Sequence, residues 1–208
     1  MTPLDPAGFA AATGVSRETL DRLAAYAALL RSWSERINLV GPATLGDVWR
    51  RHFLDSAQLL PFLPAGAHSL IDLGSGAGFP GLVLAILGVP GVVLTESDSR
   101  KAAFLREAAR IAAAAVEVHA GRIEALPPRR FDVVTARGFS PLDRLLIAAE
   151  RFIGPDTRCL LLKGERVGEE LAEARRRWAM VAVCHRSRSD PRGAILKLER
   201  IRRENPRA

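Results

Sequence analysis

The chain has 208 residues, 48% of them hydrophobic and 25% charged, which indicates one domain with a small appendage and excludes intrinsic disorder. No basic segment followed by an apolar run stands at its start, so we expect no signal peptide, and its two cysteines lack the spacing of a metal site or a disulfide framework. The formal net charge of +7 comes from residues 100–208, which hold 24 basic and 14 acidic side chains; this favours a nucleic acid partner over a membrane, although arginine-rich coding would give the same excess.

The first sixty residues carry helical patterns. Ser16 is a suitable N-cap, and apolar side chains then recur at helical spacing as far as Trp33. A second helix is expected over residues 44–60. We therefore expect residues 1–64 to form an N-terminal helical cap on a larger unit, residues 65–208, with the two making one compact body.

Strands alternate with helices in the rest of the chain. This alternation predicts an α/β fold with a mostly parallel, doubly wound sheet. The last two strands have no helix between them, so they predict a C-terminal antiparallel hairpin at one edge of the sheet. The predicted strands lie at residues 68–73, 91–96, 116–119, 131–136, 158–163, 179–185 and 194–198, and the predicted helices at 99–115 and 165–178.

A glycine-rich run follows the first strand and opens a helix, which is where open α/β sheets bind ligands. The spacing Gly76-x-Gly78-x-x-Gly81 matches the fingerprint of a dinucleotide site. The alternative frame, Asp72-x-Gly74-x-Gly76-x-Gly78, is an acid followed by alternating glycines, which is typical of class I methyltransferases. An acid suits the sulfonium and ammonium of S-adenosylmethionine better than it suits a pyrophosphate. We therefore favour S-adenosylmethionine over NAD, with a purely structural turn as the third alternative.

Glu96 ends the second strand, 24 residues after Asp72. An acid at that place can accept hydrogen bonds from both ribose hydroxyls of an adenosine. This holds for either cofactor, and a solvated strand end remains the alternative.

At this point the sequence resembles the bacterial ribosomal RNA small subunit methyltransferase G family, also called glucose-inhibited division protein B. The motifs that carry the resemblance occur in order from about residue 33 to residue 170. Where the family often has a Lys pair this chain has Arg100-Lys101, and where it often has Ala this chain has Gly138. Neither departure removes a charge. The motifs are Ile37-Asn38-Leu39-Val40, His52-x-x-Asp55-Ser56, the run from Asp72 to Gly81 with its Gly78-Phe79-Pro80-Gly81, Glu96-Ser97, Lys101 with Phe104-Leu105, Arg122-Ile123-Glu124, Phe131-Asp132 with Thr135-Ala136-Arg137, Lys163-Gly164 and Glu169-Glu170.

The resemblance implies a class I, Rossmann-like methyltransferase that uses S-adenosylmethionine to methylate N7 of a guanosine in the 530 loop of 16S rRNA, at position 527. It implies that Gly74 and Phe79 line the cofactor, that Ile123 and Glu124 flank the adenine, and that Arg137 lies at the mouth between cofactor and substrate. We add Asp72, Gly76, Gly78 and Glu96 to the candidate cofactor site from the loop itself.

Other side chains are candidates for substrate contact. His52 and Asp55 are three residues apart on a predicted helix and share a face, although with Arg51 they could simply form a local ion pair. Lys163 ends a strand, where it could meet an RNA phosphate or be solvated. Arginines near the late hairpin have few acids beside them and are candidates for phosphate contact: Arg186, Arg188 and Arg192.

Taken together, we expect a cytoplasmic, monomeric enzyme with 16S rRNA or the small ribosomal subunit as partner, without a metal or a membrane. A methyltransferase of small molecules or proteins, and a non-catalytic RNA-binding module, are the alternatives. Cys159 and Cys184 are expected to be reduced core thiols. Three tryptophans are expected on amphipathic helices in the core: Trp33, Trp49 and Trp178.

Overall fold

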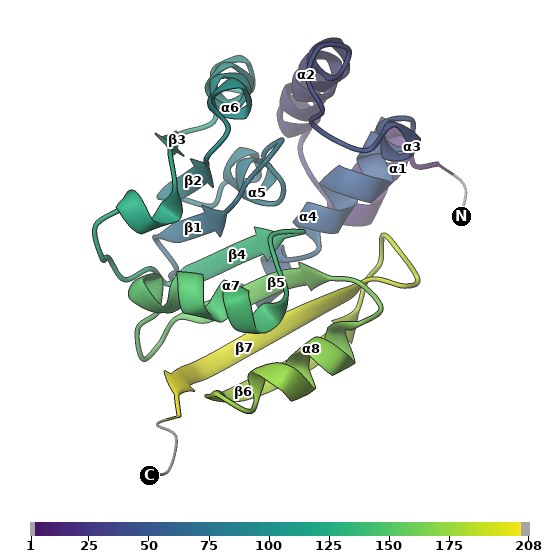
Figure 1. The fold of residues 1–208 in the computed structure, drawn as a ribbon. Coiled ribbons are helices and arrows are strands. Elements are labelled where there is room, and N and C mark those ends of the chain that lie inside the picture. Colours follow the sequence, from purple (N-terminus) through teal and green to yellow (C-terminus); the bar gives the residue numbers. More distant parts are fainter. Residues whose placement is uncertain (1–2, 205–208) are drawn as a thin grey trace.

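The computed structural model describes residues 3–204, and within them seven strands form one sheet (Figure 1). The strand order is β3-β2-β1-β4-β5-β7-β6; the first five in sequence are parallel, and β7 runs antiparallel to both β5 and β6. The predicted doubly wound α/β sheet with a C-terminal antiparallel hairpin is therefore confirmed. The strands are β1 (Leu70–Leu73), β2 (Val92–Glu96), β3 (Val116–Ala120), β4 (Val133–Arg137), β5 (Arg158–Lys163), β6 (Trp178–Arg186) and β7 (Ala194–Arg203).

Helices cover both faces of this sheet, so the molecule has three layers (Figure 1). One buried hydrophobic cluster joins β1 and β2 to α2, α5 and α6, and a second joins β4, β5 and β7 to α7 and the end of α8. The helices are α1 (Pro6–Thr13), α2 (Arg17–Ser34), α3 (Pro42–Leu45), α4 (Asp55–Ala57), α5 (Gly81–Ile86), α6 (Ser99–Ile111), α7 (Leu142–Ala149) and α8 (Val167–Ala174).

The N-terminal segment differs in part from its expected form. Ser16 caps α2 as predicted, because its side chain accepts a hydrogen bond from the Thr19 N–H. The single helix expected over residues 44–60 is wrong. Short helical pieces replace it, among them α3, a π-helical turn over Trp49–Leu54 and α4. Wide turns of this kind insert a residue into a helix and frequently mark functional sites.

Two further expectations need correction, and one helix was not expected. Trp178 is buried, but it begins β6 instead of ending a helix, because α8 stops at Ala174. Cys159 is buried, whereas Cys184 is exposed on the edge strand β6 and is not a core thiol. The helix α7 was not predicted at all.

Residues 73–95 carry no charged side chain, and they are divided among the end of β1, the glycine loop, α5 and β2. Between residues 3 and 204, no helix has the length and apolar character needed to cross a membrane.

Candidate active site

The glycine loop after β1 turns sharply at left-handed backbone positions. Gly76 has φ 59° and Gly78 has φ 95°, conformations that other residues rarely adopt. A Cβ on Gly78 would lie 2.7 Å from the Tyr26 hydroxyl, so this glycine is needed for close packing against α2. A Cβ on Gly76 would meet no atom closer than 3.9 Å. Gly76 therefore leaves its backbone open to a ligand.

Most backbone N–H groups of this loop already donate hydrogen bonds inside the protein. The Gly74 N–H donates to Thr95 Oγ1 at 3.1 Å, and the Gly76 N–H donates to Glu96 Oε2 at 2.9 Å. A loop that cradles a pyrophosphate needs its N–H groups free to point at the phosphates. The donors with protein acceptors are those of Gly74, Ser75, Gly76, Gly78, Phe79 and Gly81. These internal hydrogen bonds disfavour the dinucleotide-binding interpretation of the glycine motif.

Two carboxylates brace the loop from below and beside it. Asp72 is fully buried, and it accepts hydrogen bonds from the Thr135 hydroxyl at 2.8 Å and from the Gly81 N–H at 3.2 Å. Burial raises the pKa of Asp72 above its usual range, while these hydrogen bonds oppose the rise. Glu96 is also buried, and its second oxygen accepts from the Asp98 N–H at 2.8 Å. A carboxylate has about four acceptor sites, so Glu96 keeps capacity for ribose hydroxyls.

An aromatic seam joins the N-terminal helices to the loop. The Tyr26 ring stacks on Phe79 with 5.6 Å between centroids and lies 5.5 Å from Phe53, and its hydroxyl donates to the Ala77 carbonyl. Burial raises the pKa of Tyr26 well above its usual value, so the phenol stays protonated. Sequence reasoning missed this residue. The available signal was a single tyrosine three residues after Leu23 on the apolar face of α2.

Arg137 ends β4 and holds the seam from the other side. Its guanidinium lies over the Phe79 ring, 4.7 Å from the centroid. Nη1 lies 3.2 Å from Asp55 Oδ2 and donates to the Arg51 carbonyl, also at 3.2 Å. Arg137, which is expected at the mouth between cofactor and substrate, is thus held in place by residues of the N-terminal helical segment.

His52 is neutral at physiological pH. Burial, together with the nearby charges of Arg137 and Arg51, lowers its pKa from 6.5 to about 3. The ring stacks on Phe79 at 4.7 Å with an interplanar angle of 17°, and Nε2 lies 3.0 Å from Thr44 Oγ1. Nδ1 is buried and has no hydrogen-bond partner among the described residues. The Nδ1 atom of His52 can therefore still form a hydrogen bond, as a donor or an acceptor according to the tautomer.

A cleft of about 260 Å³ lies beside Arg137, between the helical segment, the ends of β4 and β5, and the loop that joins β6 to β7. Asp55 ties these parts together, because it accepts from Gln58 and from the Ser189 hydroxyl as well as from Arg137. The predicted grouping of His52 with Asp55 is found, since both line this cleft. The lining residues are Thr44, Arg51, His52, Asp55, Arg137, Gly138, Leu162, Lys163, Gly164, Ser189, Asp190, Gly193 and Ala194.

Lys163 reaches the cleft from β5, but its ammonium is occupied. The side chain is 9% exposed, and Nζ contacts Glu170 Oε2 at 2.8 Å and the Ser140 carbonyl at 2.9 Å. Lys163 thus bridges α8 to the loop after β4. The structure places it at the wall of the cleft instead of on a solvated strand end.

Two loops flank the glycine loop on its open side. Ile123 is buried and Glu124 exposed in the turn after β3, beside Glu96, whose carbonyl accepts from the Gly121 N–H. Phe139, in the loop after β4, covers Gly74 so closely that a Cβ there would lie 2.5 Å from its ring. The ring is 36% exposed. Phe139 was not among the predicted site residues.

The arginines of the late hairpin stand further out. Arg186 is exposed at the end of β6. Arg188 is held against the N-terminal helices, since its N–H donates to Gln58 Oε1 at 2.8 Å and its guanidinium donates to the Ala12 carbonyl at 3.3 Å. Gln58 also donates to Asp55 of the cleft, which places Arg188 beside it, and Arg186 pairs across the hairpin with Ala194, a lining residue of the cleft.

Comparison with known proteins identifies the family. The family model described as rRNA small subunit methyltransferase G matches residues 19–190. The chain belongs to this family. It is 56% identical over 200 residues to ribosomal RNA small subunit methyltransferase G of Rhodospirillum rubrum, covering 96% of this chain and all of that protein. It is 58% identical over 193 residues to the protein of the same name from Rhodospirillum centenum, covering 93% and 89%.

Solved structures agree on the fold. An O-methyltransferase from Bacillus cereus in complex with SAH has a TM-score of 0.57 at 16% identity, covering 89% of this chain and 91% of that one. A TehB-like SAM-dependent methyltransferase from Corynebacterium glutamicum also has a TM-score of 0.57, at 17% identity, covering 84% and 96%. The predicted Rossmann-like methyltransferase fold is confirmed.

Proposed function

We propose that this family member transfers a methyl group from S-adenosylmethionine to N7 of a guanosine in the 530 loop of 16S rRNA, at position 527. Its relatives over nearly the whole chain are named ribosomal RNA small subunit methyltransferase G. The observation that carries the cofactor choice is the glycine loop: six of its backbone N–H groups donate within the protein, and the carboxylates of Asp72 and Glu96 lie against it as acceptors. Such a site suits a cationic ligand, and it has few free N–H donors for a pyrophosphate.

The cofactor would lie across the open side of the loop. Gly76 would let it approach the backbone, Gly74 and Gly78 would hold the shape of the loop against Phe139 and Tyr26, and Glu96 would accept hydrogen bonds from the ribose hydroxyls. Ile123 and Glu124 would flank the adenine. Asp72, which is buried, would act from beneath by fixing the loop to α5 and β4.

The guanine would enter beside Arg137, where the cleft opens next to the loop. S-adenosylmethionine supplies a methyl group activated by its sulfonium. Guanine N7 has a free lone pair and no proton at neutral pH, so its attack needs no general base. The work of the protein is then to align N7 with the methyl carbon and sulfur. Phe139 offers an exposed ring for stacking an unpaired base, and the neutral His52 and the carboxylate of Asp55 can stabilise the positive charge that develops on the guanine.

RNA outside the target base would be held by phosphate contacts. Arg186 and Arg188 are our candidates, and Lys163 is a weaker one because its ammonium is paired with Glu170. We further propose that residues 1–64 and 65–208 act as one unit and that the protein is a monomer located in the cytoplasm.

The decisive experiment is a map of N7-methylguanosine in 16S rRNA from cells with the gene, without it, and complemented with the Glu96→Ala variant. We expect one modified guanosine in the 530 loop that is absent without the gene. Calorimetry should show that Glu96→Ala weakens S-adenosylmethionine binding by roughly 1.5–3 kcal/mol, the scale of a hydrogen bond to a charged group. Micromolar binding of NAD would reverse the choice of cofactor.

A further inference from the structure

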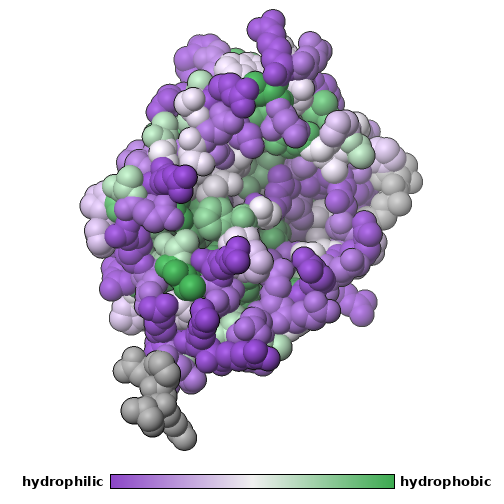
Figure 2. Space-filling view, in the orientation of Figure 1, coloured by the Kyte–Doolittle hydropathy of each residue, from purple (hydrophilic) through white to green (hydrophobic). Residues whose placement is uncertain are grey.

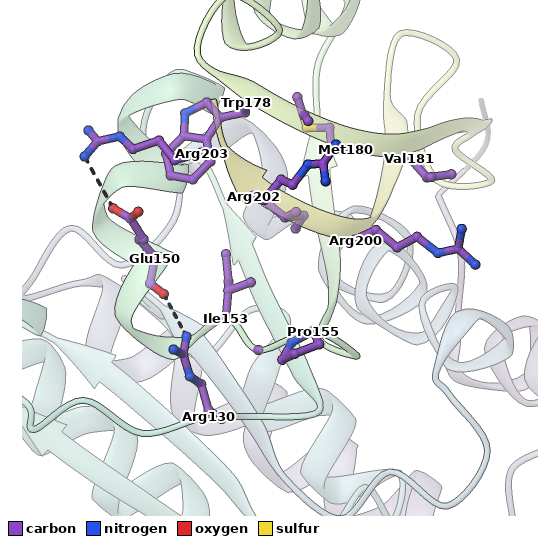
Figure 3. A pocket seen from close by; sticks show the side chains of 13 residues that line it. Arg130, Glu150, Ile153, Pro155, Trp178, Met180, Val181, Arg200, Arg202 and Arg203 are labelled. Atoms are coloured by element: carbon purple, nitrogen blue, oxygen red, sulfur yellow. Dashed lines mark hydrogen bonds and ion pairs between the residues drawn. The ribbon is translucent and has the colours of Figure 1, made fainter. Parts of the chain in front are cut away.

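A second concave site lies at the opposite end of the sheet from the glycine loop. It has a volume of about 810 Å³ and is built from the start of β6, the end of β7 and the loops that precede β4 and β5 (Figure 3). These segments meet at the amino ends of β4 and β5, whereas the glycine loop lies at the carboxyl ends of the parallel strands. The site therefore shares no residue with the candidate active site. We call it the arginine cleft. Its lining residues are Arg130, Glu150, Ile153, Gly154, Pro155, Trp178, Ala179, Met180, Val181, Arg200, Ile201, Arg202 and Arg203.

The charge of this cleft is strongly unbalanced, since four arginines line it and Glu150 is its one acid. Glu150 is already engaged: its carboxylate lies 3.7 Å from Arg203 Nη1, and its carbonyl accepts from Arg130 (Figure 3). Arg200 and Arg202 are exposed and have no ion pair or hydrogen-bonded side-chain partner among residues 3–204. Two guanidinium groups are thus left for a ligand.

A β-bulge sets the direction of these two arginines. Ala179 pairs with Arg202 and Val181 with Glu199, so β7 has one residue more than β6 in between, and Arg200 adopts φ 54°. A bulge shifts the alternation of a strand by one residue. As a result Ile201 packs against the core cluster that contains Leu198, while the arginines on either side of it stay in solvent. A non-glycine residue at positive φ is strained and persists where the surroundings enforce it.

The lining of the cleft combines apolar and cationic groups. Ile153 is buried, Met180 and Ile201 are partly buried, and Val181 is 46% exposed. Guanidinium groups match phosphate oxygens in a bidentate geometry, and an apolar surface between them suits a base or a ribose. A volume of this size falls in the range of ligand sites, which hold a molecule as large as a nucleotide. The chemistry therefore fits a polynucleotide better than a compact anion.

From this we infer that the arginine cleft is a second RNA-docking site, which holds a phosphodiester segment of the substrate RNA at the far end of the sheet from the methylated base. The inference rests on the proposed function, because it assigns the same rRNA to the cleft. β6 links Arg186 at one end to the cleft at the other, over roughly 25 Å at the usual rise of a strand. RNA bound at both ends would run along this exposed edge strand.

Charge reversal tests the inference. Arg200→Glu with Arg202→Glu should reduce the salt dependence of 16S rRNA binding, because each lost phosphate contact lowers the slope of log K against log salt by about 0.7–0.9. Between 50 and 200 mM salt two contacts correspond to about a tenfold change in affinity. Arg31→Glu with Arg106→Glu is the matched control. It makes the same change in net charge on exposed residues of α2 and α6, far from the β6 edge, and should have a smaller effect.

The double variant should bind S-adenosylmethionine with unchanged affinity, and this measurement also shows that it is folded. Arg202→Glu alone is the milder variant. Equal slopes for the wild type, the double variant and Arg202→Glu would overturn the inference, as would an equal loss in the control. If the wild type still methylates 16S rRNA in that case, the proposed function stands. If the wild type neither binds nor methylates the rRNA, both fail. A photoreactive residue replacing Val181 should cross-link to 16S rRNA in the small subunit; a cross-link to ribosomal protein alone would show a different occupant and overturn the inference.

Discussion

At the carboxyl ends of β1, β2 and β4, charged groups are buried and hydrogen-bonded, whereas at the start of β6 and the end of β7 they are exposed and short of partners. Asp72 and Glu96 each receive hydrogen bonds from protein donors, and Arg137 is clamped by Asp55 and Phe79. The arginine cleft instead presents Arg200 and Arg202 to solvent. Figure 2 shows how hydrophilic side chains dominate this view of the surface, apart from a hydrophobic area near its centre.

The difference matches the two tasks that we propose for the two ends of the sheet. A reaction that depends on alignment needs a rigid site, and rigidity comes from satisfied, buried groups with few alternatives. Docking a polyanion needs mobile charges that can release counterions and adjust to phosphates. The aromatic seam of Tyr26, Phe53 and Phe79 supplies the rigidity at the first end.

The largest expected effect contrasts the seam with the cleft. Phe53→Ala should lower the free energy of unfolding by about 3–5 kcal/mol, because Phe53 is fully buried between the N-terminal helices and Phe79. Val181→Ala, at an exposed position of the arginine cleft, should cost under about 0.5 kcal/mol. Denaturant unfolding measures both. One cooperative transition is expected, and two separated transitions would mean that the helical segment folds apart from the sheet.

Phe139 tests whether the rigid end receives a base. Among the described residues it is the exposed aromatic ring beside the glycine loop. Phe139→Ala should raise KM or lower kcat for 16S rRNA by an amount worth about 1–3 kcal/mol, the value of stacking one base on an aromatic ring. Phe139→Tyr, which keeps an aromatic ring, should retain the kcat/KM of the wild type. A variant with Ala that keeps full kcat/KM would exclude stacking on this ring.

Much of this architecture follows from local sequence patterns. The strand at residues 158–163 was predicted with both its bounds, and the parallel order with its terminal hairpin followed from the alternation of strands and helices. The parts that failed depend on contacts between distant residues. The helix expected over 44–60 is interrupted by a turn at residues 46–47 and widens into a π-helical turn where His52 and Phe53 pack against Phe79. Trp178 belongs to β6 because it pairs with Arg203 of β7.

The candidate site shows the same division. Motif spacing located Asp72, Glu96 and Arg137 at strand ends, because parallel strands bring their carboxyl ends together. Spacing could not show that the Asp72 carboxylate points beneath the loop, that Lys163 is paired with Glu170, or that Tyr26 holds the loop from α2. Those facts depend on packing between elements far apart in the chain.

The protonation of His52 should make the rigid end sensitive to acid. A histidine whose pKa is about 3 in the folded protein and 6.5 when unfolded binds more protons in the unfolded state between those values. Stability is therefore fully present above pH 6.5 and falls as the pH drops towards 3, at up to about 1.4 kcal/mol per pH unit. The loss by pH 5 is about 2 kcal/mol. His52→Phe, which keeps the ring against Phe79, should remove this part of the slope; an unchanged slope between pH 6.5 and 5 would contradict the assignment.

A smaller effect is expected from the Tyr26 hydroxyl. Tyr26→Phe keeps the ring but removes the hydrogen bond to the Ala77 carbonyl, at a cost of about 1 kcal/mol in stability. Because that bond anchors the glycine loop, the affinity for S-adenosylmethionine should fall as well. Thr13→Val is the matched control, since it removes a hydroxyl-to-carbonyl bond to Phe9 within α1. It should lower stability without changing cofactor affinity, and equal cofactor affinities for all three proteins would exclude a role for Tyr26 in shaping the loop.

The smallest expected effect is the absence of a pH dependence in the chemical step. Guanine N7 has no proton to lose, and His52 already has a pKa near 3, so neither group should titrate near neutral pH. With saturating substrates and folded enzyme, single-turnover rates should be nearly flat from about pH 6.5 to 9, without the limb that a titrating base imposes. Arg137→Lys should lower the rate, because the planar guanidinium that contacts Phe79 and Asp55 is lost and the reactants are less well aligned. The pH profile should stay flat, because this change removes no proton acceptor. A rate that rises tenfold per pH unit in the wild type, and becomes flat when His52 or Asp55 is replaced, would show that a side chain removes a proton and that N7 is not the atom methylated.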